Sequence, residues 1–265
     1  MRFRTGLVVA VLLLAAATTL TQPAERTWAE RMWIDERRNY EQWLLTAEIE
    51  GLGAVGEGVT NPTKVTLSHD GRVFYAIYKP LKRGRQKGYW ESYQAEVAAY
   101  ALDKMLGLDM VPPTVVRRVS SDLGSLQLWV EGCDTYKRLE PEVPKSPQFS
   151  WQISRMKMFD NLIYNEDRNA GNFLLDVYWN VILIDHSRAF LERKNLLKER
   201  TKLPSQFDRK LVEQLKSLSE EQLERELDGL LDGGQIESIL ARRDQILEHM
   251  ESLIAERGAS AVLFN

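Results

Sequence analysis

The sequence predicts an α+β fold of two lobes, the first rich in β-strands and the second mainly helical. Strand-like patterns and an Asp-Gly hairpin signal gather in residues 51–133, whereas apolar helical periodicity dominates residues 151–265. Residues 134–150 lie between them and combine prolines with polar residues, which is typical of a linker. At 265 residues with 44% apolar content, the chain is long enough to bury a core of this size.

Residues 1–24 differ from the rest of the chain, because the basic "MRFRT" precedes the apolar "GLVVAVLLLAAATTL". The pattern predicts a signal peptide or a membrane anchor, with an ordinary buried helix as the third alternative. The apolar run is shorter than the ~20 residues that span a bilayer, but no strong small-x-small cleavage site follows it. We therefore expect export to a periplasm, a secretory lumen or the exterior, or membrane association through residues 6–20.

Composition excludes some function classes. A net charge of -3 and a pI near 5.8 give no general attraction to nucleic acid, so no nucleic-acid partner is expected. Cys133 is the only cysteine, which rules out an intramolecular disulfide. The three histidines are widely separated and show no zinc-ligand spacing. Any metal is therefore expected on oxygen ligands.

The elements of the first lobe follow in order. Residues 25–50 predict a helical N-terminal extension, and "KVTLSHDGRVFYAIYKP" predicts a β-hairpin turning at its Asp-Gly pair. "WESYQAEVAAYALDKMLGLD" has apolar residues at helical spacing, so we expect an amphipathic helix that ends near Gly107. The segments "TVVRRV" and "LQLWVEG" predict two further strands.

A glycine-rich loop is expected before the hairpin, where Gly51, Gly53, Gly56 and Gly58 crowd together. The first three match G-x-G-x-x-G, but that motif is weak alone and lacks the strand-to-helix context of a dinucleotide fold. "GEGVTNP", with Gly56 and Gly58, is the alternative phosphate cover. A purely structural turn at its Asn-Pro pair is equally consistent with the sequence.

Three polar residues surround an apolar strand in the second lobe. Asp167 and Asn172 are separated by four residues, and Asp185 follows the apolar "VILI". Phosphoryl transfer requires this set, because one carboxylate orients the acceptor hydroxyl while an Asn oxygen and a second carboxylate hold magnesium on ATP. Each residue alone could instead serve a turn, a loop hydrogen bond or, for Asp185, an ion pair with Arg168 or Arg188.

"DNLIYNEDRNAGN" and "LIDHSRAF" resemble the active-site region of the atypical kinases. These comprise the phosphatidylinositol kinases, the toxin kinase HipA and, above all, the Golgi secretory-pathway kinases. "AEVAAYALDKMLGLDMVPPTVVRRV" resembles a helix-and-strand region of the Golgi group, so that the resemblance covers roughly residues 50 to 190. It implies a two-lobed protein-kinase-like fold that transfers the ATP γ-phosphate to a hydroxyl of a protein Ser/Thr, sugar or lipid, with Mg²⁺ or Mn²⁺.

The resemblance also implies roles for the polar residues. Asp167 would be the catalytic base, Asn172 and Asp185 the metal ligands, and Arg168 a support for the loop. One departure is that "HSR" follows Asp185, where ordinary protein kinases have Phe-Gly. His186 occupies that variable place and receives no role.

The first lobe must supply a lysine for the phosphates and a glutamate to hold it. Lys79 ends the strand "VFYAIYK", where a lysine by itself would usually be a snorkelling surface residue. Glu96 interrupts an apolar helix face and so needs a cation, whereas Glu91 is expected to be solvated. The resemblance also selects Glu96 and places it close to the metal.

The segment "LQLWVEG" would form the adenine hinge, with backbone groups of Trp129, Val130 and Glu131 pairing with the base; a plain buried strand is the alternative. Two other functions stay open. A pseudokinase or nucleotide-binding scaffold would keep the fold without turnover. A carboxylate-pair hydrolase would need a water between Asp167 and Asp185 and would have no use for Lys79.

Overall fold

The computed structural model describes residues 31–55, 62–198 and 203–265. The predicted signal or anchor (1–24), Gly56 and Gly58 lie outside the described residues. Within the described ranges, no helix is both long and apolar enough to cross a membrane.

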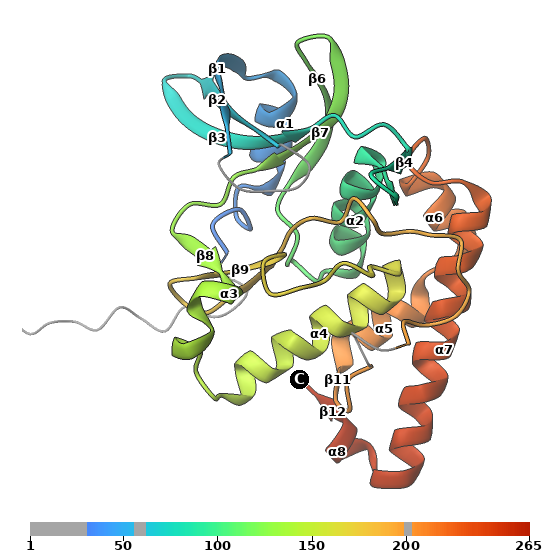
Figure 1. Ribbon diagram of the computed structural model, residues 1–265. Helices are drawn as coiled ribbons and strands as arrows, with labels where there is room; N and C mark the ends of the chain where they lie inside the picture. Colours follow the sequence, from blue (N-terminus) through green and yellow to red (C-terminus); the bar gives the residue numbers. More distant parts are fainter. Residues whose placement is uncertain (1–30, 56–61, 199–202) are drawn as a thin grey trace, which may run out of the picture.

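The described chain forms two lobes, and a five-stranded antiparallel sheet dominates the first (Figure 1). Its strand order is β1-β2-β3-β7-β6. Along the chain, the short hairpin β4-β5 and helix α2 lie between β3 and β6. The elements of this lobe are α1 (Arg37–Thr46), β1 (Glu48–Ala54), β2 (Thr63–His69), β3 (Arg72–Lys79), β4 (Gly84–Gln86), β5 (Tyr89–Glu91), α2 (Tyr93–Leu106), β6 (Thr114–Val119) and β7 (Asp122–Leu128).

The predicted hairpin is present as β2 and β3. Asp70 and Gly71 form its turn with φ angles of 48° and 77°, and positive φ at both central residues defines the tight hairpin turn that Asp-Gly favours. Alternate side chains such as Val65, Leu67 and Ala76 are buried on one face of the sheet. The opposite face of β3 carries Lys79 and faces the second lobe.

Of two predictions about the chain before the hairpin, one is seen in part and the other is wrong. Among the described residues 31–50 of the extension, the helix covers Arg37–Thr46, and its Tyr40 and Leu44 pack with Trp33 in the core of the first lobe. A strand begins already at Glu48, so Gly51 and Gly53 lie within β1 rather than in a loop. Pairing with β2 satisfies the backbone of this segment, which outweighs the turn preference of glycine.

Helix α2 confirms the predicted amphipathic helix and joins the lobes. Ser92 caps its N-terminus by accepting from the N–H of Gln94, and Gly107 ends it with a φ of 58°, as the sequence predicts. Its apolar face, including Leu102 and Leu106, belongs to the larger hydrophobic core, which extends through the second lobe. The helix therefore holds Glu96 at the level where the lobes meet.

The second lobe is mainly helical, with the long helix α7 along its side (Figure 1). The predicted linker (134–150) contains short regular elements, because β8 pairs with β9 and a short helix follows it. The elements are β8 (Cys133–Thr135), α3 (Tyr136–Leu139), a 3-10 turn (Glu140–Glu142), α4 (Pro147–Ile163), β9 (Phe173–Asp176), β10 (Val181–Leu183), β11 (Phe207–Asp208), α5 (Arg209–Ser217), α6 (Glu220–Glu226), α7 (Gly233–Arg257), α8 (Ala259–Val262) and β12 (Leu263–Phe264).

The first three residues of the apolar "VILI" form β10, which pairs antiparallel with β9. This hairpin lies between Asn172 and Asp185, so the two residues meet at one end of it, with Ile184 N–H donating to the Asn172 carbonyl.

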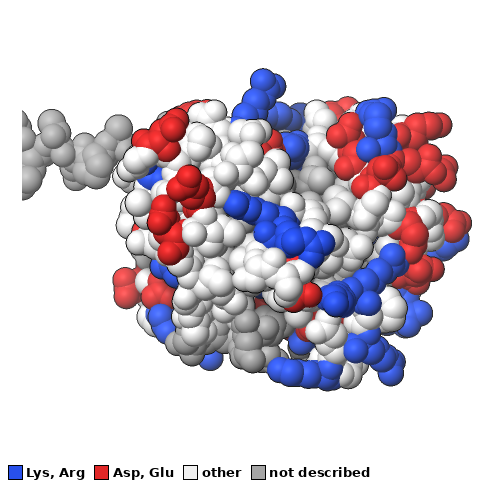
Figure 2. Space-filling view, turned by 90° about the horizontal axis from the view of Figure 1, so that it is seen from above, with Lys and Arg blue, Asp and Glu red and all other residues white. Residues whose placement is uncertain are grey.

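On the face seen from above, Lys/Arg and Asp/Glu side chains are interspersed (Figure 2).

Candidate functional site

A cavity of about 810 Å³ lies between the two lobes. The sheet contributes Ile77 and Lys79, the segment after β7 contributes Trp129 and Val130, and the second lobe contributes residues such as Asp185. The lining combines charged residues with apolar residues. This combination is typical of a site that binds a ligand with a charged part and a flat apolar part.

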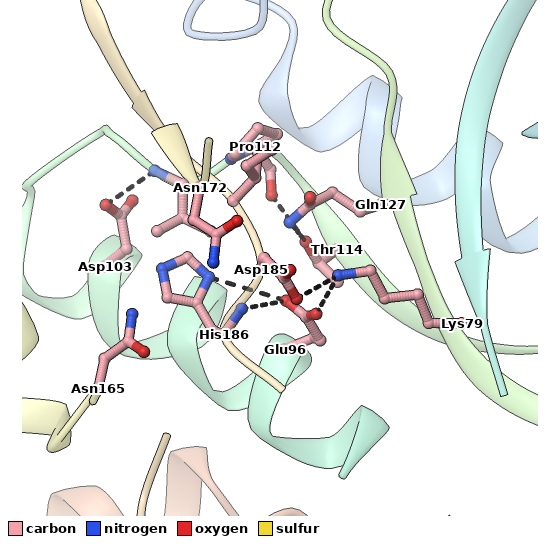
Figure 3. Close-up of polar contacts among 12 residues, drawn as sticks. Lys79, Glu96, Asp103, Pro112, Thr114, Gln127, Asn165, Asn172, Asp185 and His186 are labelled. Atoms are coloured by element: carbon pink, nitrogen blue, oxygen red, sulfur yellow. Dashed lines mark hydrogen bonds and ion pairs between the residues drawn. The ribbon is translucent and has the colours of Figure 1, made fainter. Parts of the chain in front are cut away.

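Lys79 is a buried cation in the lining of the cavity. It is buried at the end of β3, and its Nζ donates to Glu96 Oε1 at 2.5 Å and to Asp185 Oδ1 at 2.9 Å (Figure 3). Burial alone would lower the pKa of Lys79, but the carboxylates of Asp185 and Glu96 outweigh it and raise that pKa. The lysine is therefore a permanently charged ammonium.

Glu96 is the predicted partner of that lysine. Its Oε1 accepts from Lys79, and its Oε2 accepts from the backbone N–H of His186 at 2.8 Å. Burial would raise the pKa of Glu96, but Lys79 and then His186 outweigh it and lower that pKa. Both oxygens have donors in this arrangement, so its predicted approach to a metal stays a prediction.

Asp185 and Asn172 are the predicted metal ligands, and they lie close together in Figure 3. The Asp185 side chain is 30% exposed, and only its Oδ1 accepts from Lys79. Asn172 donates from Nδ2 to the Asp167 carbonyl at 2.8 Å, which leaves its Oδ1 for another donor or a cation. Carboxylate and amide oxygens suit Mg²⁺ and Mn²⁺, so the two residues fit such an ion.

Arg168 fixes the loop between Asp167 and Asn172. Its Nε donates to Asp160 Oδ2 at 3.0 Å, and its Nη1 donates to the carbonyls of Asn172 and Ile184. Asp160 lies on α4, and its side chain is fully buried. The predicted supporting role of Arg168 thus corresponds to contacts that join α4, the loop and the segment before Asp185.

Asp167 lines a second cavity, also of about 810 Å³. Its side chain is 29% exposed, and its Oδ2 lies 3.1 Å from an Arg188 nitrogen. Arg188 also donates to Glu91 Oε1 at 2.9 Å and lies over the ring of Tyr89. The prediction that Glu91 is solvated is wrong, because β5 turns it inward to meet Arg188.

The predicted hinge is present in part. Trp129 and Val130 line the first cavity, whereas Glu131 is exposed and is not among its lining residues. The Trp129 N–H donates to the Tyr75 carbonyl at 2.9 Å, and the Cys133 thiol donates to the Val130 carbonyl at 3.0 Å. The Trp129 N–H is therefore already used, whereas the Val130 carbonyl keeps a second lone pair.

His186, to which the sequence analysis gave no role, connects the two halves of the site. Its Nε2 accepts from Arg168 at 2.9 Å, and its Nδ1 lies 3.7 Å from Glu96 Oε2. Burial, with Arg168 adding to it, lowers the pKa of His186, which therefore stays neutral. The ring fills the space between the glutamate of α2 and the arginine of the loop.

Sequence reasoning also missed Asp160 and Arg188. A signal for Asp160 was present, because it interrupts the apolar helix "MKMFDNLIY" in the same way that Glu96 interrupts α2. Arg188 offered no comparable signal, since its partners come from β5 and from the loop of Asp167.

Comparison with solved structures identifies the architecture. The structure of the Golgi casein kinase with Mn/ADP bound matches with a TM-score of 0.65 and 17% identity, over 85% of this chain and 78% of that one. The structure of hydra Fam20 with sugar matches with a TM-score of 0.64 and 16% identity, over 84% of this chain and 90% of that one. The chain has a kinase-like two-lobed fold. At these identities the likeness concerns the fold alone.

Sequence comparison finds a relative that matches part of the chain. No family model matches the chain. Protein Rv2133c of Mycobacterium tuberculosis is 27% identical over an alignment of 180 residues, and the match covers 54% of this chain. The match spans 64% of the length of that protein.

Proposed function

We propose that the protein is a phosphotransferase that uses ATP and Mg²⁺ or Mn²⁺ to phosphorylate a hydroxyl group. The observation that carries the proposal is the contact of Lys79 with both Glu96 and Asp185. Phosphoryl transfer needs a fixed cation beside a carboxylate with an open oxygen, and the kinase-like fold supports that use of the contact. In a carboxylate-pair hydrolase the lysine would have no task.

The residues divide the work by position. Lys79 would contact phosphate oxygens, while Glu96 holds its side chain in place. Asn172 and Asp185 would hold the divalent cation, which supplies charge neutralisation when bound. Arg168 keeps Asn172 in register by bonding its carbonyl. The mechanism consists of positioning and charge stabilisation.

Asp167 would orient the acceptor hydroxyl and accept its proton. Support comes from its place in the lining of the second cavity, where it contacts Arg188. Arg188 and Arg193 line that cavity together with the aromatic rings of Tyr89 and Trp90. The acceptor class, protein Ser/Thr, sugar or lipid, is open, and we keep export or membrane anchoring through residues 1–24 as part of the proposal.

The test uses the purified full chain with labelled ATP, Mn²⁺ or Mg²⁺ and the three acceptor classes. We expect label transfer to one class, or slow ATP consumption without an acceptor. Asp185→Ala should lower turnover by more than about a hundredfold while leaving the unfolding midpoint nearly unchanged. The matched control is Asp244→Ala, which removes an exposed aspartate on α7.

Turnover that persists in Asp185→Ala would contradict the assignment. ATP binding that depends on the metal but produces no turnover in the wild type would favour a nucleotide-binding scaffold instead.

A further inference from the structure

The wall of the first cavity contains a buried amide whose orientation is fixed. Gln127 is only 9% exposed and lies on β7, where it pairs with Ile77 of β3. Residues directly opposite each other in a sheet share a face, so Gln127 lies on the face of Ile77 and Lys79. It lines the cavity together with Lys79 and Trp129, and it precedes Trp129 by two residues.

The hydroxyl of Thr114 determines which way this amide points. Thr114 lies opposite Gln127 in the sheet, and its Oγ1 donates to the Pro112 carbonyl at 2.8 Å. A carbonyl only accepts, so the single hydroxyl proton is used there and Thr114 Oγ1 is left as an acceptor. Gln127 Nε2 donates to it at 2.9 Å (Figure 3).

The opposite amide orientation would be unfavourable. It would place Gln127 Oε1 next to Thr114 Oγ1. The single hydroxyl proton of Thr114 could then serve either Gln127 Oε1 or the Pro112 carbonyl, but not both. Thr114 is 2% exposed, so water does not compensate such a contact. The carbonyl oxygen of Gln127 is thus the group left for the cavity, and no donor within the described ranges bonds to it.

A purine in this cavity would bring its C6 substituent to that wall. Lys79 and Asp185 define the end where phosphates bind, and the ribose links them to N9 of the base. The six-membered ring is the part of a purine farthest from N9, so it points away from Lys79, toward the β7 wall and Trp129. Ile77 and Leu174 offer apolar contacts for the base.

We propose that Gln127, held by Thr114 and Pro112, selects purine nucleotides that carry an amino group at C6 over those that carry an oxo group there. This inference rests on the proposed function. Adenine donates from its 6-amino group to Oε1, whereas the 6-oxo group of guanine or hypoxanthine would place two acceptors against each other. Unpaired acceptors are strongly disfavoured in a buried site, so we expect roughly a 10- to 100-fold preference.

The test measures binding of ATP and inosine triphosphate to the full chain with Mn²⁺, by equilibrium titration. Inosine triphosphate lacks the 2-amino group of GTP, so it isolates changes on the six-membered ring at C6 and N1. Gln127→Leu removes the acceptor and should reduce the ATP preference about tenfold. Thr114→Val leaves Gln127 in place but frees its amide to rotate, so the preference should fall by a similar factor.

Thr114→Ser is the matched variant, because it restores the hydroxyl and should restore the preference. A residual preference in Gln127→Leu is expected, since N1 also differs between the two bases. Thermal unfolding checks each variant, and if Thr114→Val fails to fold, Gln127→Leu and Thr114→Ser decide the question.

An ATP preference that is unchanged in Gln127→Leu would overturn this inference while leaving the phosphotransferase proposal intact. A wild-type protein that binds neither nucleotide with Mn²⁺ would overturn the proposed function and this inference with it. A preference that persists in Thr114→Val but falls in Gln127→Leu would overturn the role of Thr114 in fixing the amide.

Discussion

Two aspartates of the second lobe show how the same side chain serves different ends. Asp160 is 0% exposed and accepts from Arg168 and from Asn165 Nδ2 at 3.1 Å. Asp185 is 30% exposed and accepts from Lys79 through one oxygen. Asp160 is saturated with donors, whereas Asp185 keeps an oxygen open beside a cation. The open carboxylate is the one that suits an incoming charged ligand.

The surrounding backbone reinforces the contrast. Asp160 lies in the regular helix α4, while Asp185 has a φ of 60°, in the left-handed region. Aspartate tolerates this conformation better than most residues, and such conformations gather at functional sites. A buried pair such as Asp160–Arg168 holds structure only because both partners are present. The comparison therefore predicts that losing Asp160 harms folding, whereas losing Asp185 harms activity.

The largest effect is expected for Asp160→Ala. It leaves the Arg168 guanidinium buried without its carboxylate, so the free energy of unfolding should fall by about 3–5 kcal/mol. Asp185→Ala should change it by less than about 1 kcal/mol, because Asp185 is partly exposed and Lys79 keeps Glu96. Urea unfolding measures both, with Asp244→Ala as the surface control. Equal losses in the two variants would remove the distinction.

The sequence could predict those site residues that local patterns mark. Lys79 was predicted from a strand end and Glu96 from a charge on an apolar helix face, whereas Asn172 and Asp185 were predicted from their motif and its resemblance to kinases. The fold places Lys79, Asn172 and Asp185 in the lining of one cavity, with Glu96 bonded to Lys79. Their positions follow from local patterns of period two or 3.6, together with one hairpin. The same kind of pattern predicted the two-lobed fold class, and the structure confirms it.

The remaining contacts depend on tertiary geometry that no local pattern encodes. Arg188 meets Glu91 only because Ser92 N–H donates to the Ser187 carbonyl and brings the two segments together. Gly51 and Gly53 join a strand because β2 offers backbone partners. Such pairings join distant parts of the chain, so they appear only once the fold is known.

Asp103 extends the comparison to a buried carboxylate without a bonded cation. Its Oδ1 accepts from the N–H groups of Met110 and Val111, and its Oδ2 has no partner within the described ranges. Burial is the main cause that raises the pKa of Asp103 to about 7. The folded state then holds a proton that the unfolded state loses above about pH 4.

Stability should therefore decline as pH rises from about 4 to about 7, since the folded state binds more protons there. Asp103→Asn keeps an acceptor for Met110 and Val111 but does not titrate. Relative to the wild type, it should gain on the order of 1–3 kcal/mol across this range, measured by urea unfolding at several pH values. A constant difference between the two proteins would show that Asp103 is ionised throughout.

The smallest expected effect concerns Asp167, which is 29% exposed, nearly as exposed as Asp185, but contacts Arg188 instead of Lys79. Arg188 is itself held by Glu91, so under the proposed function it would be a positioning residue for Asp167 rather than a group that touches ATP. Arg188→Ala should lower kcat about tenfold, which is about 1.4 kcal/mol, while leaving KM for ATP within about twofold. A purely structural role would instead lower the unfolding midpoint.

Glu91→Gln provides the graded comparison for Arg188→Ala. It keeps a hydrogen-bond acceptor for Arg188 but removes the charge, so its effect on kcat should be smaller than that of Arg188→Ala. If Arg188→Ala raised KM for ATP and left kcat unchanged, the arginine would belong to the nucleotide side. Asp167 would then resemble Asp185, with its open oxygen serving the same ligand rather than a separate acceptor.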